Sequence, residues 1–160
     1  MTNFSDAMLG RADLSRADLS SAHLNDASLN GANLSEAKLN MANLTKAYLG
    51  GANLIGAKFD NADLNGAFLD EYGLEKKGPR TIKFKLKYDD VTLETLLKAN
   101  NLDLAHIIYT KLEEDLERKA GEMVDDPNID LSKLSPKNRS SIERWANRYS
   151  HRTNEANQDN

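Results

Sequence analysis

The stretch GANLSEAKLN, residues 31–40, consists of two copies of one five-residue word, GANLS and EAKLN. The same word fills the first part of the chain without interruption. Thirteen alanines recur every five residues from Ala7 to Ala67, and a large apolar residue, leucine or Phe59, follows each alanine by two positions. Phe4 and Leu74 extend the column of large residues by one at each end.

A repeat of five residues fits neither the 3.6-residue turn of an α-helix nor a long strand that alternates every two residues. Within each word the alanine and the large residue are two positions apart, so a short extended segment points both to the same side. The next two positions are mostly Ser, Asn, Asp, Gly, Lys or Thr, and such residues favour turns. Each word therefore predicts a very short strand followed by a corner, and the corners wind the chain into a coil with Ala and Leu inside.

Residues 3–74 resemble the pentapeptide-repeat family, whose consensus is A(D/N)Lxx; RADLSRADLS, GANLSEAKLN and NADLNGAFLD match it. The resemblance implies a mainly β solenoid, a right-handed quadrilateral β-helix with four words per coil and roughly 3.5 coils. We expect residues 1–74 to form this domain. The large residues would fill its centre, and alanine would lie where only a methyl group fits. Representative core positions are Leu14, Leu34, Leu54, Phe59 and Ala37.

If four words make a coil, residues 20 apart stack in columns on the outside. One column contains Met8, Ser28, Tyr48 and Phe68, and its Tyr48–Phe68 pair is the most prominent exposed apolar feature. The C-terminal segment of the same chain could cover this pair, a second copy or another partner could bind it, or it could simply be exposed. The columns that contain aligned asparagines predict hydrogen-bonded side-chain ladders, which we interpret as structural.

The repeat stops after Leu74. Residues 75–90 are predicted to be a linker and a strand, because Ile82, Phe84, Leu86 and Tyr88 alternate with lysines. This strand could cap the open end of the β-helix. Residues 91–150 are predicted to be α-helical, and residues 151–160, which lack large apolar groups, to be a disordered tail.

Three helices are expected in the 91–150 region. Asp89 or Asp90 would cap the first, Asp103 would cap a longer one with an apolar stripe to Met123, and Ser135-Pro136 would begin the third.

Charge is segregated in the second half of the chain: residues 76–87 carry +6, residues 89–130 carry −8 and residues 133–152 carry +5. The simplest interpretation is that the basic last helix packs on the acidic long helix, with Trp145 as a buried anchor. Alternatively, the same helix face binds an external partner, since Trp, Tyr and Arg are frequent hot-spot residues. The candidate interface residues of this face are Trp145, Tyr149, Arg144 and Arg148.

Composition and motifs exclude several classes of site. The 160 residues contain no cysteine, which excludes disulfides and thiolate metal sites. There is no apparent signal peptide or membrane-length apolar run, so a cytoplasmic protein that does not bind membranes is expected. His23, His106 and His151 have no metal-ligand spacing, and no nucleotide-binding or nucleophile motif is present. We predict no catalytic residues, no metal, no cofactor and no enzymatic activity.

These observations favour a non-enzymatic interaction or scaffold protein with an unknown protein partner, and a homodimer through the end of the coil or the Tyr48–Phe68 face is possible. Some proteins of the resembled family, the quinolone-resistance proteins, mimic DNA and bind type II topoisomerases. Here the repeat is short and residues 1–74 hold nine acidic and five basic side chains, which makes this alternative weaker. A further alternative is nucleic-acid binding through the lysine-rich strand and the arginine-rich helix, although the net charge of −4 disfavours it.

Overall fold

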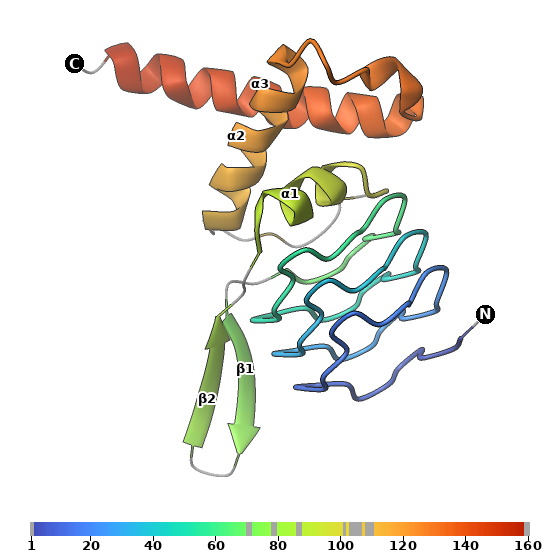
Figure 1. Ribbon diagram of the computed structural model, residues 1–160. Helices are drawn as coiled ribbons and strands as arrows, with labels where there is room; N and C mark the ends of the chain where they lie inside the picture. The colour runs from blue at the N-terminus through green and yellow to red at the C-terminus, as the bar shows by residue number, and fades with distance from the viewer. Residues whose placement is uncertain are drawn as a thin grey trace.

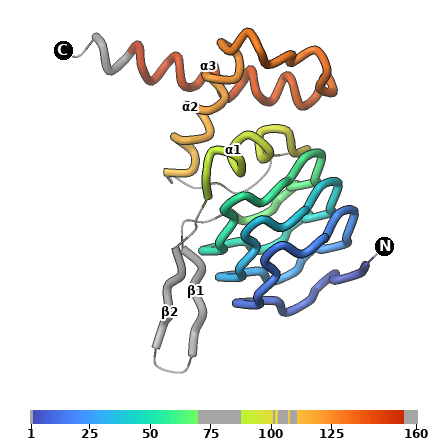
Figure 2. Tube along the Cα trace, viewed as in Figure 1, coloured from blue at the N-terminus to red at the C-terminus, as the bar shows by residue number. Residues whose placement is uncertain are grey.

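The computed structural model describes residues 2–69, 72–77, 80–85, 88–100, 102, 107 and 111–158. It places a coiled β-helix at the N-terminal end and three helices beyond one end of the coil (Figure 1). The trace in Figure 2 shows the coils stacked from the N-terminus upward, with α1 lying across the last of them.

Parallel bridges join residues that are 20 positions apart, from Asn3↔His23 to Tyr48↔Phe68. One coil therefore consists of four five-residue words, as the family resemblance implied. From the second coil onward, each bridge residue makes two backbone hydrogen bonds to the preceding coil. Ser28, for example, donates its N–H to the carbonyl of Ala7 at 2.9 Å and accepts from the N–H of Leu9 at 2.8 Å. The coils thus form four narrow parallel sheets.

The corner of every word is a four-residue turn with one residue in the left-handed region. Ala7 N–H donates to Phe4 C=O at 3.1 Å, and the residue before Ala7, Asp6, has φ 59°. The same position has φ between 57° and 71° in all thirteen words. No β-branched residue occupies any of these positions, which agrees with the steric cost of positive φ for such side chains.

The core of the β-helix is narrow and apolar. Leu34, Leu54, Phe59 and Ala37 are all 0% exposed, whereas Leu14, in the first coil, is half-buried. The bridge position explains the preference for Asn and Asp between the alanine and the leucine, because its side-chain oxygen accepts from the N–H two residues later. Ser35 N–H donates in this way to Asn33 Oδ1 at 3.2 Å.

Strands β1 (Tyr72–Lys77) and β2 (Arg80–Lys85) form an antiparallel pair, from Tyr72↔Lys85 to Lys77↔Arg80. The single strand predicted from the alternation at 82–88 therefore overlaps β2, and its backbone partner is β1. Residues 86 and 87 lie outside the described residues. Leu74, which the periodicity placed at the end of the repeat, belongs to β1.

Helix α1 (Asp90–Leu97) covers the C-terminal end of the β-helix, where the sequence had predicted a capping strand. It buries Leu93, Leu96 and Leu97. The hydroxyl of Thr92 donates to the carbonyl of Leu54 at 2.6 Å, and that of Thr95 to the carbonyl of Ala57 at 3.2 Å. A helix can seal this end because it brings both an apolar face and hydroxyl donors for the last coil's carbonyls.

The cap also supplies hydrogen bonds that a further coil would have made. Gly56 N–H donates to Asp89 Oδ1 at 3.1 Å, Asn61 N–H to Lys98 C=O at 3.2 Å and Leu64 N–H to Asn100 C=O at 2.9 Å. Asn100 forms a parallel bridge with Asp63, as a bridge residue of a further coil would. The β-helix is therefore closed at this end by both backbone and side-chain groups.

Helix α2 (Lys111–Asp125) contacts α1 and is followed by the 3₁₀ turn η2 (Leu131–Lys133). Helix α3 (Pro136–Gln158) lies across α2. Helix α3 begins at the predicted proline. The helix expected after Asp103 is described only from Lys111, since residues 103–106 and 108–110 lie outside the described residues.

The prediction of a disordered tail at 151–160 is wrong for the described residues, because α3 continues to Gln158. The lack of large apolar side chains in this segment did not predict its secondary structure. Arg152 reaches Glu117 of α2, and the hydroxyl of Thr153 donates to the carbonyl of Tyr149 at 3.1 Å, so polar contacts accompany the additional turns.

Candidate interaction surfaces

The aromatic column consists of Met8, Ser28, Tyr48 and Phe68, which lie on one side of the β-helix in consecutive coils. The rings of Tyr48 and Phe68 stack, with centroids 4.7 Å apart and planes within 1° of parallel. Met8 is 93% exposed and Tyr48 is 42% exposed. The structure therefore brings these predicted residues together in one column, and no described segment covers Tyr48 completely.

Two glycines beside this column, Gly50 and Gly51, are buried. Their backbone does not offer a surface for another molecule to approach. The most exposed side chains of the aromatic column are Met8 and Tyr48, and Ser28 and Phe68 are partly exposed.

Charges on the outside of the β-helix are paired between coils. Arg16 Nε lies 3.0 Å from Glu36 Oε2, and Lys38 Nζ lies 3.5 Å from Asp18 Oδ2. The ladder predicted for one column is also present: Asn53 Nδ2 donates to Asn33 Oδ1 at 3.0 Å, and Asn33 Nδ2 donates to Asp13 Oδ1 at 3.1 Å. These pairs interrupt the acidic rows that a mimic of the DNA backbone would need.

The helical candidates divide between the core and the surface. Trp145 is 4% exposed, and the guanidinium of Arg148 lies 4.9 Å from the centre of its ring. Tyr149 is 37% exposed and packs on Gly121 of α2, while Arg144 and Arg148 are exposed. Because the Trp145 ring is buried in the chain's own core, it is not accessible as an external hot spot; the other three positions stay predictions.

The acidic and basic helices meet as the charge segregation indicated. Arg148 Nη1 lies 3.8 Å from Glu113 Oε1, and Arg152 Nη1 lies 4.0 Å from Glu114 Oε1. The Arg152–Glu114 pair and the Arg148 side chain are solvent-exposed, and both distances are long, so each pair contributes little to stability. They orient α3 on α2 and reduce the charge available to an external ligand.

Glu117 is a buried carboxylate that the sequence did not distinguish from its acidic neighbours. Its side chain is 2% exposed and borders an open pocket of about 230 Å³, lined also by Glu114, Tyr149, Arg152 and Thr153. Arg152 Nε lies 3.0 Å from Glu117 Oε2, but this oxygen accepts no hydrogen bond from the described residues. Burial raises the pKa of Glu117, with Arg152 opposing the rise and Glu113 adding to it.

We expect Glu117 to make the protein less stable as the pH rises. A carboxyl whose pKa is higher in the folded than in the unfolded state favours folding below the unfolded value, and this advantage is lost as the pH rises through the folded pKa. The difference in unfolding free energy between wild type and Glu117→Gln should therefore fall from about pH 4 upward. Urea titrations at a series of pH values measure it. A difference that stays constant or grows with pH would contradict the assignment.

Among the residues that the structure describes, no group of three or more His, Asp or Glu side chains could hold a metal ion. Within the same ranges, none of the helices has the length and apolar character of a membrane span.

Comparison with known proteins assigns the repeat to a family. A family model described as pentapeptide repeats matches residues 2–35 and 37–71 with eight copies. No curated protein matches the chain.

Three similar solved structures are pentapeptide repeat proteins. One, from the cyanobacterium Cyanothece 51142, is 34% identical over 56% of this chain and 58% of its own, with a TM-score of 0.42. A second, from the thylakoid lumen of Arabidopsis thaliana, is 22% identical over 88% of this chain and 83% of its own, with a TM-score of 0.45. The third, HetL from Nostoc sp. strain PCC 7120, is involved in the regulation of heterocyst differentiation; it is 37% identical over 43% of this chain and 35% of its own, with a TM-score of 0.32.

Proposed function

Because a pentapeptide-repeat model matches residues 2–35 and 37–71 of this chain, we propose that the protein is a non-enzymatic interaction module that binds another protein through the aromatic column. Proteins of this family are generally structural or interaction modules. The observation that carries the proposal is the stacked Tyr48–Phe68 pair, which leaves Tyr48 42% exposed on a rigid backbone.

The geometry of this column suits recognition of an apolar protein surface. The backbone of each coil is hydrogen-bonded to the next, so the column is held in place without a partner and little conformational entropy is lost on binding. A stacked aromatic pair offers a flat apolar area, and the hydroxyl of Tyr48 can make a polar contact at its edge. Exposed aromatic residues of this kind are frequent interface anchors.

The test is affinity capture from native lysate with three full-length baits: wild type, Tyr48→Ser and Ile55→Ser. Ile55 is a matched control, because it is also 42% exposed but lies at a corner away from the aromatic column. A partner that wild type and Ile55→Ser retain, and that Tyr48→Ser loses, would then be purified and its affinity for the three proteins measured. We expect Tyr48→Ser to weaken binding at least about 30-fold, the loss typical of a hot-spot residue. Capture of the same proteins by all three baits would reject the aromatic column as the binding surface.

The contacts in the structure give less support to the two alternative functions. Ion pairs between coils interrupt the acidic rows that topoisomerase binding by DNA mimicry would require. Arg148 and Arg152 already face acidic residues of α2, which disfavours a nucleic-acid site on α3. A gyrase supercoiling assay and a salt-dependent mobility-shift assay test these alternatives directly.

A further inference from the structure

The first coil has an edge whose backbone groups lack partners among the described residues. In the second coil, Ser28 directs both its N–H and its C=O toward the first coil. Met8 is its equivalent, so both of its groups point away from the rest of the molecule. The same holds for Asn3, Asp13 and Asp18, whose equivalents His23, Asn33 and Lys38 make the same two bonds. We call these four residues the open edge.

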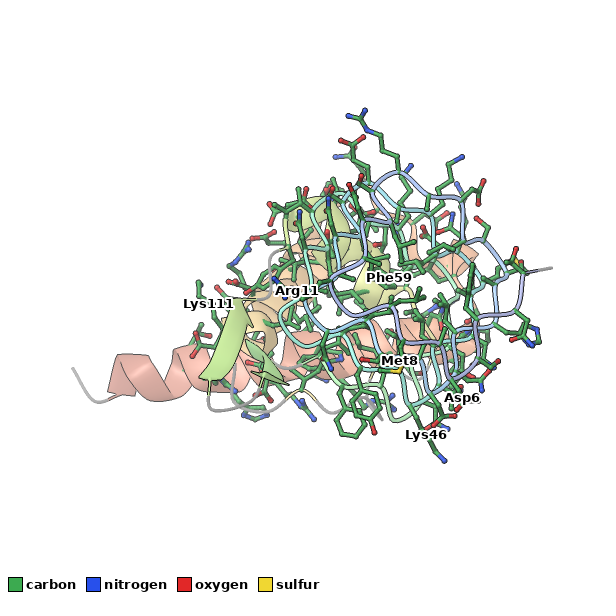
Figure 3. All side chains as sticks on the ribbon, turned by 90° about the horizontal axis from the view of Figure 1, so that it is seen from below. Asp6, Met8, Arg11, Lys46, Phe59 and Lys111 are labelled. Carbon is green, nitrogen blue, oxygen red and sulfur yellow. The ribbon has the colours of Figure 1, made fainter. Side chains whose placement is uncertain are left out.

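The apolar core is also incompletely covered at the open edge. Phe4, Leu9 and Leu14 are half-buried, whereas the residues stacked on them, Leu24, Leu29 and Leu34, are 0% exposed. Figure 3 looks onto this end from below, with Asp6, Met8 and Arg11 of the first coil labelled. The three helices lie at the other end of the β-helix (Figure 1).

Head-to-tail stacking of coils is blocked by the cap. A parallel continuation would have to join the open edge to the last coil of another molecule, but Asp89, Lys98 and Asn100 already occupy the hydrogen-bonding groups there. A surface that pairs with the open edge must therefore also present the N–H and the C=O of one residue side by side. Two residues that do so can exchange both hydrogen bonds as an antiparallel pair.

We propose that the open edge binds the open edge of a second copy of this chain, which forms a two-fold symmetric, end-to-end dimer. When two coils of the same hand face each other, their backbones run in opposite directions on all four sides, as antiparallel pairing requires. The contact covers both the unpaired backbone groups and the exposed parts of Phe4, Leu9 and Leu14. This inference concerns the end of the coil; it shares Met8 with the aromatic column but does not depend on the Tyr48–Phe68 pair, so either proposal can fail alone.

The charges select one of the four registers that a square cross-section allows. In three registers a carboxylate of the open edge faces another carboxylate: Asp13 opposite Asp18, Asp13 opposite Asp13, or Asp18 opposite Asp18. In the fourth, Met8 faces Asp13 of the second copy, and Asn3 faces Asp18. The dimer adopts this fourth register, because like charges directly opposite each other destabilise a strand pair.

The corners support the same register. It places Asp6 of each copy opposite Arg16 of the other, which makes two such pairs. It also places the Arg11 residues of the two copies opposite each other, which makes one pair. The register that pairs Asp13 with Asp18 would instead place Asp6 opposite Asp6 and Arg16 opposite Arg16. Arg16 also contacts Glu36 of its own chain, so each Asp6–Arg16 pair would extend an existing ion pair.

Disulfide formation tests the register, since the chain contains no cysteine. Paired residues of this type have Cα atoms about 5.5 Å apart, which a disulfide can bridge. Met8→Cys and Asp13→Cys proteins are prepared separately, one with a mass tag, then mixed and oxidised. The expected product is the mixed covalent dimer. A mixture of Ser28→Cys, which lies in the second coil, with Asp13→Cys is the matched control and should remain monomeric on a denaturing gel.

Two outcomes of this experiment would overturn the proposal: the absence of the mixed dimer, or an equal yield from the control mixture. Efficient cross-linking of Asp13→Cys with itself would likewise reject the register.

Sedimentation equilibrium measures the dimer dissociation constant without any cysteine variant. Asp6→Arg should raise the dimer dissociation constant about tenfold, because two ion pairs become repulsive contacts. The double variant Asp6→Arg/Arg16→Asp should restore it, while Lys46→Glu, two coils away from the open edge, should leave it unchanged. A wild-type protein that stays monomeric at the highest attainable concentration, or a dimer indifferent to Asp6→Arg, would reject the open edge as the contact.

Discussion

Replacement of Leu34 by alanine should lower the free energy of unfolding by about 3–5 kcal/mol. Leu34 is 0% exposed, and the backbone of its own coil is held by hydrogen bonds to the coils on both sides, so the surrounding side chains cannot move far enough to fill the space. The cavity therefore stays largely open. Urea unfolding followed by circular dichroism measures the loss.

Leu14→Ala is the matched control for this prediction, since it makes the same chemical change at the same position of the word. Leu14 is half-buried at the open edge, so its side chain buries less apolar area than that of Leu34. The space left by the substitution is also open to solvent. We expect a loss of about 1–2 kcal/mol. Equal losses for the two variants would show that the first coil is covered in solution.

Replacement of Asp89 by alanine should cost about 2–4 kcal/mol. One oxygen of Asp89 accepts from the N–H of Thr92 at 2.9 Å and from the N–H of Gly56 at 3.1 Å, and it lies 2.7 Å from the hydroxyl oxygen of Thr92. It therefore caps α1 and completes the last coil at once. Asp89→Asn keeps an acceptor oxygen and should cost less than about 1 kcal/mol. Equal losses for the two variants would mean that these hydrogen bonds do not stabilise the cap.

The contribution of Asp89 should disappear in acid. Burial by itself raises the pKa of Asp89, but the hydrogen bonds from Thr92 and Gly56 outweigh burial and hold it below its ordinary value. The stabilisation is therefore present above the unfolded pKa, near 3.9, and is lost as the pH falls through the folded pKa. The difference in unfolding free energy between wild type and Asp89→Asn should become smaller below about pH 4. This pH dependence is opposite to the one expected for Glu117.

The helical half shows where sequence patterns were sufficient and where they were not. Local signals predicted the start of α3 at Pro136 and limited the cap of α1 to Asp89 or Asp90, of which the structure uses Asp89, because capping depends on residues within one turn. Nothing local distinguished Glu117 from Glu113 or Glu114, since its burial depends on α3 packing across α2. The length of α3 was underestimated for the same reason, as its last turns contact α2 through Arg152.

The sequence alone determined the β-helix. A five-residue rhythm of small and large apolar side chains fits neither a helix nor a long strand, and none of the thirteen positive-φ corner positions holds a β-branched residue. The size of a coil was not visible in the periodicity itself and came from family resemblance.

Only the tertiary structure decided which element seals the coil and which end stays open. The alternating strand pattern was the expected cap, and α1 covers that end instead. The choice depends on whether donors such as Thr92, Thr95 and Asp89 meet the free groups of the last coil, a match between residues more than 30 positions apart. Such long-range complementarity leaves no periodic signal in the sequence, because it is set by where the two elements come together in space.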